Sequence, residues 1–204
     1  MKKVIGIGET ILDILFKDNR PMKAVPGGSV FNSIVSLGRM GVAPILVSEV
    51  GGDRVGDIVV ESLVDSGVDV SCIYRYSDVK SPVSLAFLNE NNDAEYLFYK
   101  ENTTTHLDVE FPNIEPDDIV IYGSYFVLNP LLRGKVKAFL EYAREKGAIL
   151  YYDVNFRKNH EAEKLKLSEA LIENLEYADI VRGSIDDFKV LYGMDDAAKV
   201  YREK

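Results

Sequence analysis

Cysteine, histidine and tryptophan are scarce in this sequence. Its 204 residues include one cysteine, two histidines and no tryptophan. A single Cys72 cannot form an internal disulfide, and His106 and His160 lack the spacing of a zinc site. No apolar run approaches the roughly 20 residues of a membrane-spanning helix, and the first residues lack the pattern of a secretory signal. We therefore expect a cytoplasmic protein without a disulfide framework.

Basic residues are outnumbered by acidic ones. There are 24 Lys and Arg against 33 Asp and Glu, which gives a formal net charge of −9. Nucleic acids and anionic membranes attract positively charged surfaces, so this balance argues against both as partners. We expect a small-molecule partner instead.

Short apolar runs alternate with amphipathic segments along the chain. The runs are typical of buried strands: KVIGIG from Lys3, PILVSEV from Pro44, DIVIYGS from Asp118, AILYYDV from Ala148 and ADIVRG from Ala178. Helical periodicity occupies residues 29–40, 54–65, 130–146 and 161–176. Strands that alternate with helices predict an α/β layered fold with a mostly parallel central sheet covered on both faces.

Two segments interrupt this alternation. Residues 82–105 contain two β-rich runs around NENND, whose Asn and Asp residues favour a tight turn. Residues 11–25 alternate similarly and turn at DNRP. We expect these insertions to form a small β-sheet that serves as a lid over a site or as a contact between subunits.

The stretch VPGGSVFN, residues 25–32, enters the first predicted helix. With Ser29 as N-cap, helical phase places Asn32 opposite the apolar sector, in the first turn, where unpaired N–H groups favour ligand acceptor atoms. Gly27 and Gly28 have no Cβ, so a ligand can approach their backbone closely. The alternative is an ordinary Gly-Gly turn followed by a solvated Asn.

Polar residues follow two of the predicted strands. Asp13 comes after the first strand, and Asp153, Asn155 and Arg157 come after the run AILYY. Ligands of open α/β sheets bind at the carboxyl ends of strands, where Asp accepts hydrogen bonds from hydroxyls and Arg binds phosphate. The alternative for Asp13 is an exposed position in a loop. For Asp153 it is the cap of a turn, and for Arg157 it is an ordinary surface charge.

After the last predicted strand, Ser184 precedes Asp186 and Asp187 at a helix start. Acidic residues in a first helical turn commonly complement the helix dipole. Carboxylates here, with Asp153, are also candidates to hold a hydrated magnesium ion, which usually takes one or two carboxylates.

Together these motifs resemble the ribokinase-like (PfkB) family of sugar kinases. GETILD is similar to the family's strand-one motif, PGGSVFNSIVSLGRMGV to its Gly-Gly-Asn signature, and SEVGGDRVG to the end of that signature. LVDSGVD, the hairpin SPVSLAFLNENNDAEYLFYK, DVNFR and VRGSIDDFKVLYG follow in the family's order. The resemblance implies a ribokinase-like, Rossmann-type layered fold, with residues 11–25 and 82–105 as a β lid that often makes a dimer contact.

The resemblance also implies transfer of the ATP γ-phosphate to a sugar hydroxyl with Mg²⁺. Asp13, Gly27, Gly28 and Asn32 would then hold sugar hydroxyls. Phe98 and Lys100 of the hairpin would face the substrate.

Asn155 and Arg157 would lie near the substrate and the transferred phosphate. Ser184 and Asp187 replace the family's Asn-x-x-Glu near the metal, which is why Asp187 is a candidate to act on magnesium without binding it directly.

The family's second signature, Gly-Ala-Gly-Asp with the catalytic base, does not occur in these residues. We therefore expect residues 1–204 to be the N-terminal, substrate-binding part of one ribokinase-like domain, inactive alone, with the base beyond Lys204. A fructokinase is the leading interpretation. The alternatives are a 2-keto-3-deoxygluconate kinase, whose acidic substrate Lys100 and Arg157 would attract, and a non-catalytic sugar-binding module.

Overall fold

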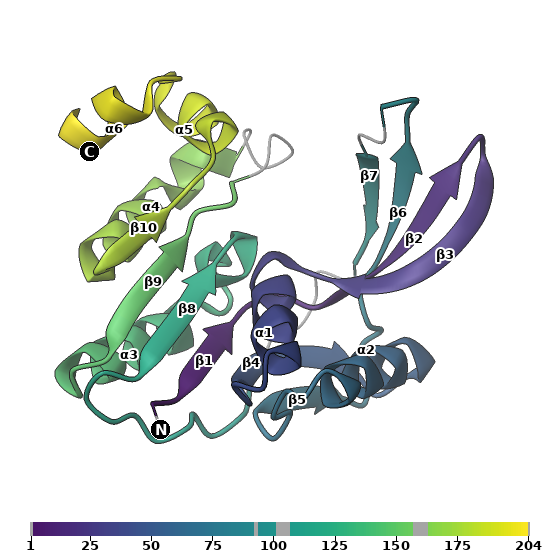
Figure 1. Cartoon of the computed structure of the whole chain (residues 1–204), viewed down its shortest axis with the longest axis horizontal. Helices are drawn as coiled ribbons and strands as arrows, with labels where there is room; N and C mark the ends of the chain where they lie inside the picture. Colours follow the sequence, from purple (N-terminus) through teal and green to yellow (C-terminus); the bar gives the residue numbers. More distant parts are fainter. Residues whose placement is uncertain (1, 92–93, 101–106, 157–162, 204) are drawn as a thin grey trace.

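The central sheet has six parallel strands in the order β10-β9-β8-β1-β4-β5 (Figure 1). The computed structural model describes residues 2–91, 94–100, 107–156 and 163–203. The strands are β1 (Val4–Ile7), β4 (Ile45–Gly51), β5 (Ile73–Tyr76), β8 (Ile119–Gly123), β9 (Ile149–Asp153) and β10 (Ile180–Arg182). The parallel sheet confirms the predicted α/β fold, and the short edge strand β5 is an addition to it.

Helices cover both faces of this sheet. One buried cluster joins α1 (Ser29–Arg39) and α2 (Arg54–Asp65) to Leu46 of β4. The other joins α3 (Arg133–Glu145) and α4 (Lys164–Tyr177) to Val47, the next residue of the same strand. Successive residues of a strand point to opposite faces, so the two clusters lie on opposite sides of the sheet. The remaining helices are η1 (Tyr125–Leu128), α5 (Ile185–Tyr192) and α6 (Ala197–Glu203).

A second, accessory sheet has four strands in the order β3-β2-β6-β7. These are β2 (Ile11–Lys17), β3 (Arg20–Gly27), β6 (Val83–Leu88) and β7 (Ala94–Tyr99). Each inserted segment forms an antiparallel hairpin, and the parallel pairing of β2 with β6 joins the two hairpins. In Figure 1 the accessory sheet extends away from the central sheet, on the side of α2.

Two local predictions are wrong. Asp13 does not end the first strand: β1 ends at Ile7, and Asp13 is the third residue of β2. Ser29 is not the N-cap of α1, because Gly28 occupies that position without a side-chain cap and the Ser29 hydroxyl instead donates to Asp153. Among the described residues, no helix combines the length and the apolar character that crossing a bilayer requires.

Candidate functional site

Asp13 and Gly27 meet where the accessory sheet joins the rest of the chain. Gly27 pairs with Ile11, and a Cβ atom at Gly27 would lie 2.7 Å from Asp13 Oδ2. The Ser84 hydroxyl of β6 donates to Asp13 Oδ1. Burial raises the pKa of the Asp13 carboxyl; the Ser84 hydrogen bond opposes this rise and the nearby Glu9 carboxylate adds to it. The carboxylate is thus held beside bare backbone, an arrangement that suits a ligand rich in hydroxyls.

Gly28 has a backbone conformation that requires glycine. Its φ is 133°, and a Cβ there would lie 2.2 Å from the Glu9 carbonyl oxygen. The backbone N–H of Asn32 donates to the Gly28 carbonyl over 3.0 Å, and the Asn32 side chain is exposed. The predicted outward direction of Asn32 is confirmed, so its side-chain amide is accessible one turn after the two glycines.

Among the described residues of the loops after β8 and β9, two non-glycine residues have positive φ. These are Ser124 at 60° and Asn155 at 36°, and the Asn155 amide donates to the Ser124 hydroxyl over 3.2 Å. Such conformations are uncommon and often occur at functional sites. Arg157, predicted beside them, lies outside the described residues.

Asp153 links the glycine segment to the end of the sheet. Its Oδ2 accepts from the Ser29 hydroxyl, and its Oδ1 accepts from Arg182 Nη1 over 2.9 Å. Ser29 directly follows Gly28, so the structure brings the segments GGSVFN and DVN together, although Ser29 and Asp153 lie 124 positions apart in the sequence. Arg182 was not predicted, yet it follows an apolar run as directly as Asp153 does.

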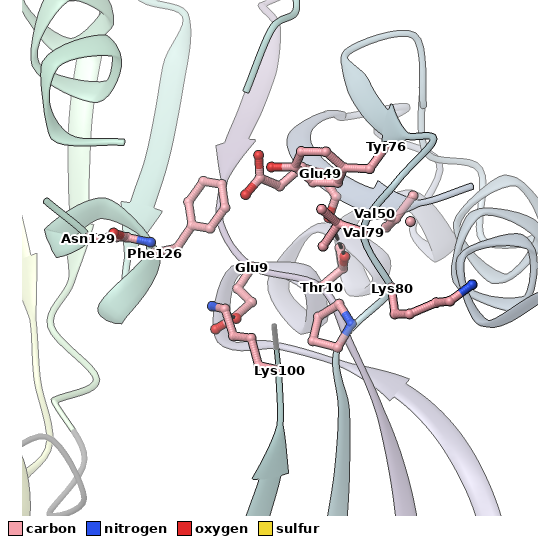
Figure 2. Close-up of a pocket in the computed structure, with 12 residues that line it drawn as sticks. Glu9, Thr10, Glu49, Val50, Tyr76, Val79, Lys80, Lys100, Phe126 and Asn129 are labelled. Carbon is pink, nitrogen blue, oxygen red and sulfur yellow. Dashed lines mark hydrogen bonds and ion pairs between the residues drawn. The ribbon is translucent and has the colours of Figure 1, made fainter. Parts of the chain in front are cut away.

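Two hairpin residues take different environments. Phe98 pairs with Ser84, stacks on Tyr96 with ring centroids 5.8 Å apart, and is half-exposed. Lys100 forms an ion pair of 2.5 Å with Glu9 of the GET motif (Figure 2). The aromatic pair therefore offers an apolar surface near Asp13, whereas the Lys100 charge is already balanced.

Glu49 of β4 lines the same pocket as Glu9 and Lys100 (Figure 2). Its Oε2 accepts from the amide of Leu107 over 3.0 Å, and the Tyr76 side chain hydrogen-bonds to it. Burial raises the pKa of Glu49, and these hydrogen bonds and the Lys100 charge oppose the rise. Sequence reasoning missed Glu9, Glu49 and Ser84, because their partners are distant in the chain.

The two carboxylates predicted to serve magnesium are engaged by protein donors. Asp187 Oδ2 accepts from the Ser184 amide and hydroxyl, each over 2.7 Å, in a capping box at the start of α5. Asp153 is held by Ser29 and Arg182. In the part of the chain that the structure describes, no three His, Cys, Asp or Glu side chains gather to hold a metal ion. Both oxygens of Asp153 and one oxygen of Asp187 therefore accept hydrogen bonds from the protein, and these donors compete with direct coordination of a metal ion.

The pattern of strands, glycines and polar residues corresponds to a known family. The model of the pfkB family carbohydrate kinases matches residues 1–203. The chain belongs to this family. This pfkB chain is 29% identical over 205 residues to the putative sugar kinase PH1459 of Pyrococcus horikoshii, covering 93% of the chain and 63% of that protein. It is 24% identical over 203 residues to Fructokinase-1 of Oryza sativa subsp. japonica, covering 94% and 63%. The pfkB chain thus spans about 63% of the length of these curated relatives.

Solved structures share the fold of this pfkB chain. The fructokinase of Vibrio cholerae O395, bound to fructose, ADP and a calcium ion, matches with a TM-score of 0.86 at 19% identity, covering 99% of this chain and 66% of that one. PH1459 in complex with ATP matches with a TM-score of 0.80 at 24% identity, covering 93% and 66%. At these identities the likeness establishes the fold, and it confirms the predicted sugar-kinase architecture.

Proposed function

We propose that this pfkB protein transfers the γ-phosphate of ATP to a hydroxyl of a monosaccharide of the fructose type. The observation that carries the proposal is the Asp13 carboxylate held against Gly27, with the exposed Asn32 nearby. Carboxylate and amide groups beside accessible backbone suit the many hydroxyls of a sugar. The rice relative is a fructokinase, the Vibrio structure contains fructose and ADP, and the PH1459 structure contains ATP.

The proposed roles follow the placement of each residue. Asp13, Gly27, Gly28 and Asn32 bind sugar hydroxyls, and Phe98 packs on the sugar's apolar face. Positioning of the reacting groups supplies much of the catalysis in phosphoryl transfer, so the accessory sheet would act as a lid that keeps the sugar oriented.

Asn155 and Arg157 are proposed to lie near the transferred phosphate. Mg²⁺ would enter with the nucleotide phosphates, because it commonly retains water and uses few protein ligands. Asp153 and Asp187 would then act on it through water.

Release of ADP from ATP tests the function. A purified protein that includes the Gly-Ala-Gly-Asp segment together with residues 1–204 would be assayed with fructose, other monosaccharides and 2-keto-3-deoxygluconate, with and without Mg²⁺. Turnover with fructose that needs Mg²⁺ is expected, and no turnover with any sugar or sugar acid contradicts the proposal. We further propose that residues 1–204 alone are inactive, because the Gly-Ala-Gly-Asp signature is not among them. Fructose binding without turnover, both in residues 1–204 and in a protein that includes the Gly-Ala-Gly-Asp segment, would instead indicate a sugar-binding module.

Lys100 favours one alternative, a sugar-acid kinase, because its ammonium group could attract a carboxylate. Lys100→Met would then weaken 2-keto-3-deoxygluconate binding while leaving fructose binding within about threefold. Its partner Glu9 already balances Lys100, so we favour the neutral sugar.

The face of the accessory sheet opposite to Asp13 and Ser84 is proposed as a homodimer contact. Leu97 and Tyr99 of β7 are exposed, and Phe16 and Phe87 stack on the same face with centroids 4.9 Å apart. Leu97→Asp should convert a dimer into a monomer in analytical ultracentrifugation. The matched change Leu165→Asp, at an exposed leucine of α4, should not. A protein that is monomeric before substitution contradicts the proposal.

A further inference from the structure

Arg182 and Asp153 end neighbouring strands at the same edge of the central sheet. They are register partners as the last residues of β10 and β9, and Gly123, the last residue of β8, pairs with Asp153 on the other side. The Arg182 guanidinium reaches across to Asp153 Oδ1 through Nη1, at 2.9 Å. Its side chain is 58% exposed, whereas that of Asp153 is 11% exposed. A nearly buried carboxylate thus holds one side of a largely accessible guanidinium.

The charges of both carboxylates that were predicted to serve magnesium act on Arg182. It pairs with Asp153, and the charge of Asp187 also acts on it, so that both carboxylates raise its pKa. The positive charge beside Asp153 at this edge of the sheet is thus an arginine of the chain itself.

The Asp153 contacts also place this arginine beside the glycine segment. The carboxylate accepts from Ser29, the residue after Gly28, and from Arg182. The Asp153 carboxylate therefore links the guanidinium, through one hydrogen bond on each side, to the residue that follows Gly28. A sugar held at Gly27 and Gly28 would lie on the Ser29 side of this link. Guanidinium presents a planar fork of donors that matches phosphate oxygens, and Nη1 alone is used on Asp153.

We propose that Arg182 binds the phosphate group of a sugar phosphate, and that Asp153 is a positioning residue that orients the guanidinium. The inference rests on the proposed sugar kinase function and adds a specific phosphate contact to it. Arg182→Gln keeps a side-chain N–H that can donate to the nearly buried Asp153 carboxylate, so this substitution should leave the fold intact.

Isothermal titration calorimetry of the purified protein tests this role, with fructose, fructose 1-phosphate, fructose 6-phosphate and inorganic phosphate as probes. Arg182→Gln should weaken the tighter-binding fructose phosphate about 10- to 100-fold, and fructose itself less than about threefold. Arg182→Lys should recover part of the loss, since it retains the charge without the fork. Asp153→Asn should cause a smaller loss, also confined to the phosphate-bearing ligand.

Arg75→Gln is the matched control. Arg75, on strand β5 at the opposite edge of the sheet, forms an ion pair with Asp57, and its side chain is 40% exposed. Its substitution should leave all probes unchanged. Equal losses for fructose and fructose phosphate in Arg182→Gln, or equal effects of Arg182→Gln and Arg75→Gln, overturn the inference alone. If the unsubstituted protein binds neither fructose nor its phosphates, the proposed function fails and this inference fails with it.

Discussion

The carboxylate of Asp13 lies so close to Gly27 that a Cβ atom at position 27 would be 2.7 Å from Oδ2. Gly27→Ala should therefore displace the carboxylate and weaken fructose binding about tenfold or more, while the protein still folds, because a side chain rather than backbone gives way. Calorimetric titration with fructose measures this effect. Gly134→Ala is the control: nothing lies within 4 Å of its Cβ in α3, so binding should be unchanged. Unaltered fructose affinity in Gly27→Ala would show that the contact between Gly27 and Asp13 is not part of the sugar site.

Gly28→Ala should damage the fold itself. The new Cβ would lie 2.2 Å from the Glu9 carbonyl oxygen, and φ is 133°. We expect the free energy of unfolding to fall by about 2 kcal/mol or more, measured by urea denaturation. Gly41→Ala has a φ of 84° but open space around it, so it should cost only the conformational strain of about 1 kcal/mol. Equal losses for the two variants would show that the contact with Glu9 has no effect.

Asp13→Asn should raise the thermal stability of the protein at pH 7 and lower its affinity for fructose. Because burial raises the pKa of Asp13, the neutral carboxyl favours folding below its unfolded pKa of about 3.8, and this contribution is lost as pH rises through the higher folded value. Asn is neutral throughout. The variant should therefore melt above the unsubstituted protein at pH 7, with the gap closing towards pH 4, and should lose fructose affinity. A gap that widens towards pH 4 has the wrong sign for this explanation.

Tyr122→Phe tests a buried hydrogen bond between β8 and α4. The Tyr122 hydroxyl donates to the Asn174 carbonyl over 2.7 Å, and both residues are fully buried. Its loss leaves the carbonyl unsatisfied, so the free energy of unfolding should fall by about 1–3 kcal/mol. Tyr201→Phe, at a tyrosine that is 90% exposed, should have no measurable effect. Chemical denaturation of both variants provides the comparison, and equal midpoints would argue against the hydrogen bond.

Local patterns were sufficient for the main elements of the fold. Helical phase correctly placed Asn32 opposite the apolar sector of α1, because the helical period sets which side chains share a face. The same reasoning failed at Ser29. A serine before a helix is usually a cap, but here its hydroxyl is used by Asp153, 124 positions away.

Sequence by itself determined the α/β class, the two β insertions and the outward direction of Asn32, since periodicity and turn composition encode these features locally. Tertiary structure alone decided which side chains meet. The parallel pairing of β2 with β6 brings Ser84 to Asp13, and the adjacency of β9 and β10 brings Arg182 to Asp153. Periodicity shows which face of a strand is buried, but strand order and register arise from long-range packing, so these contacts cannot be derived from residue spacing.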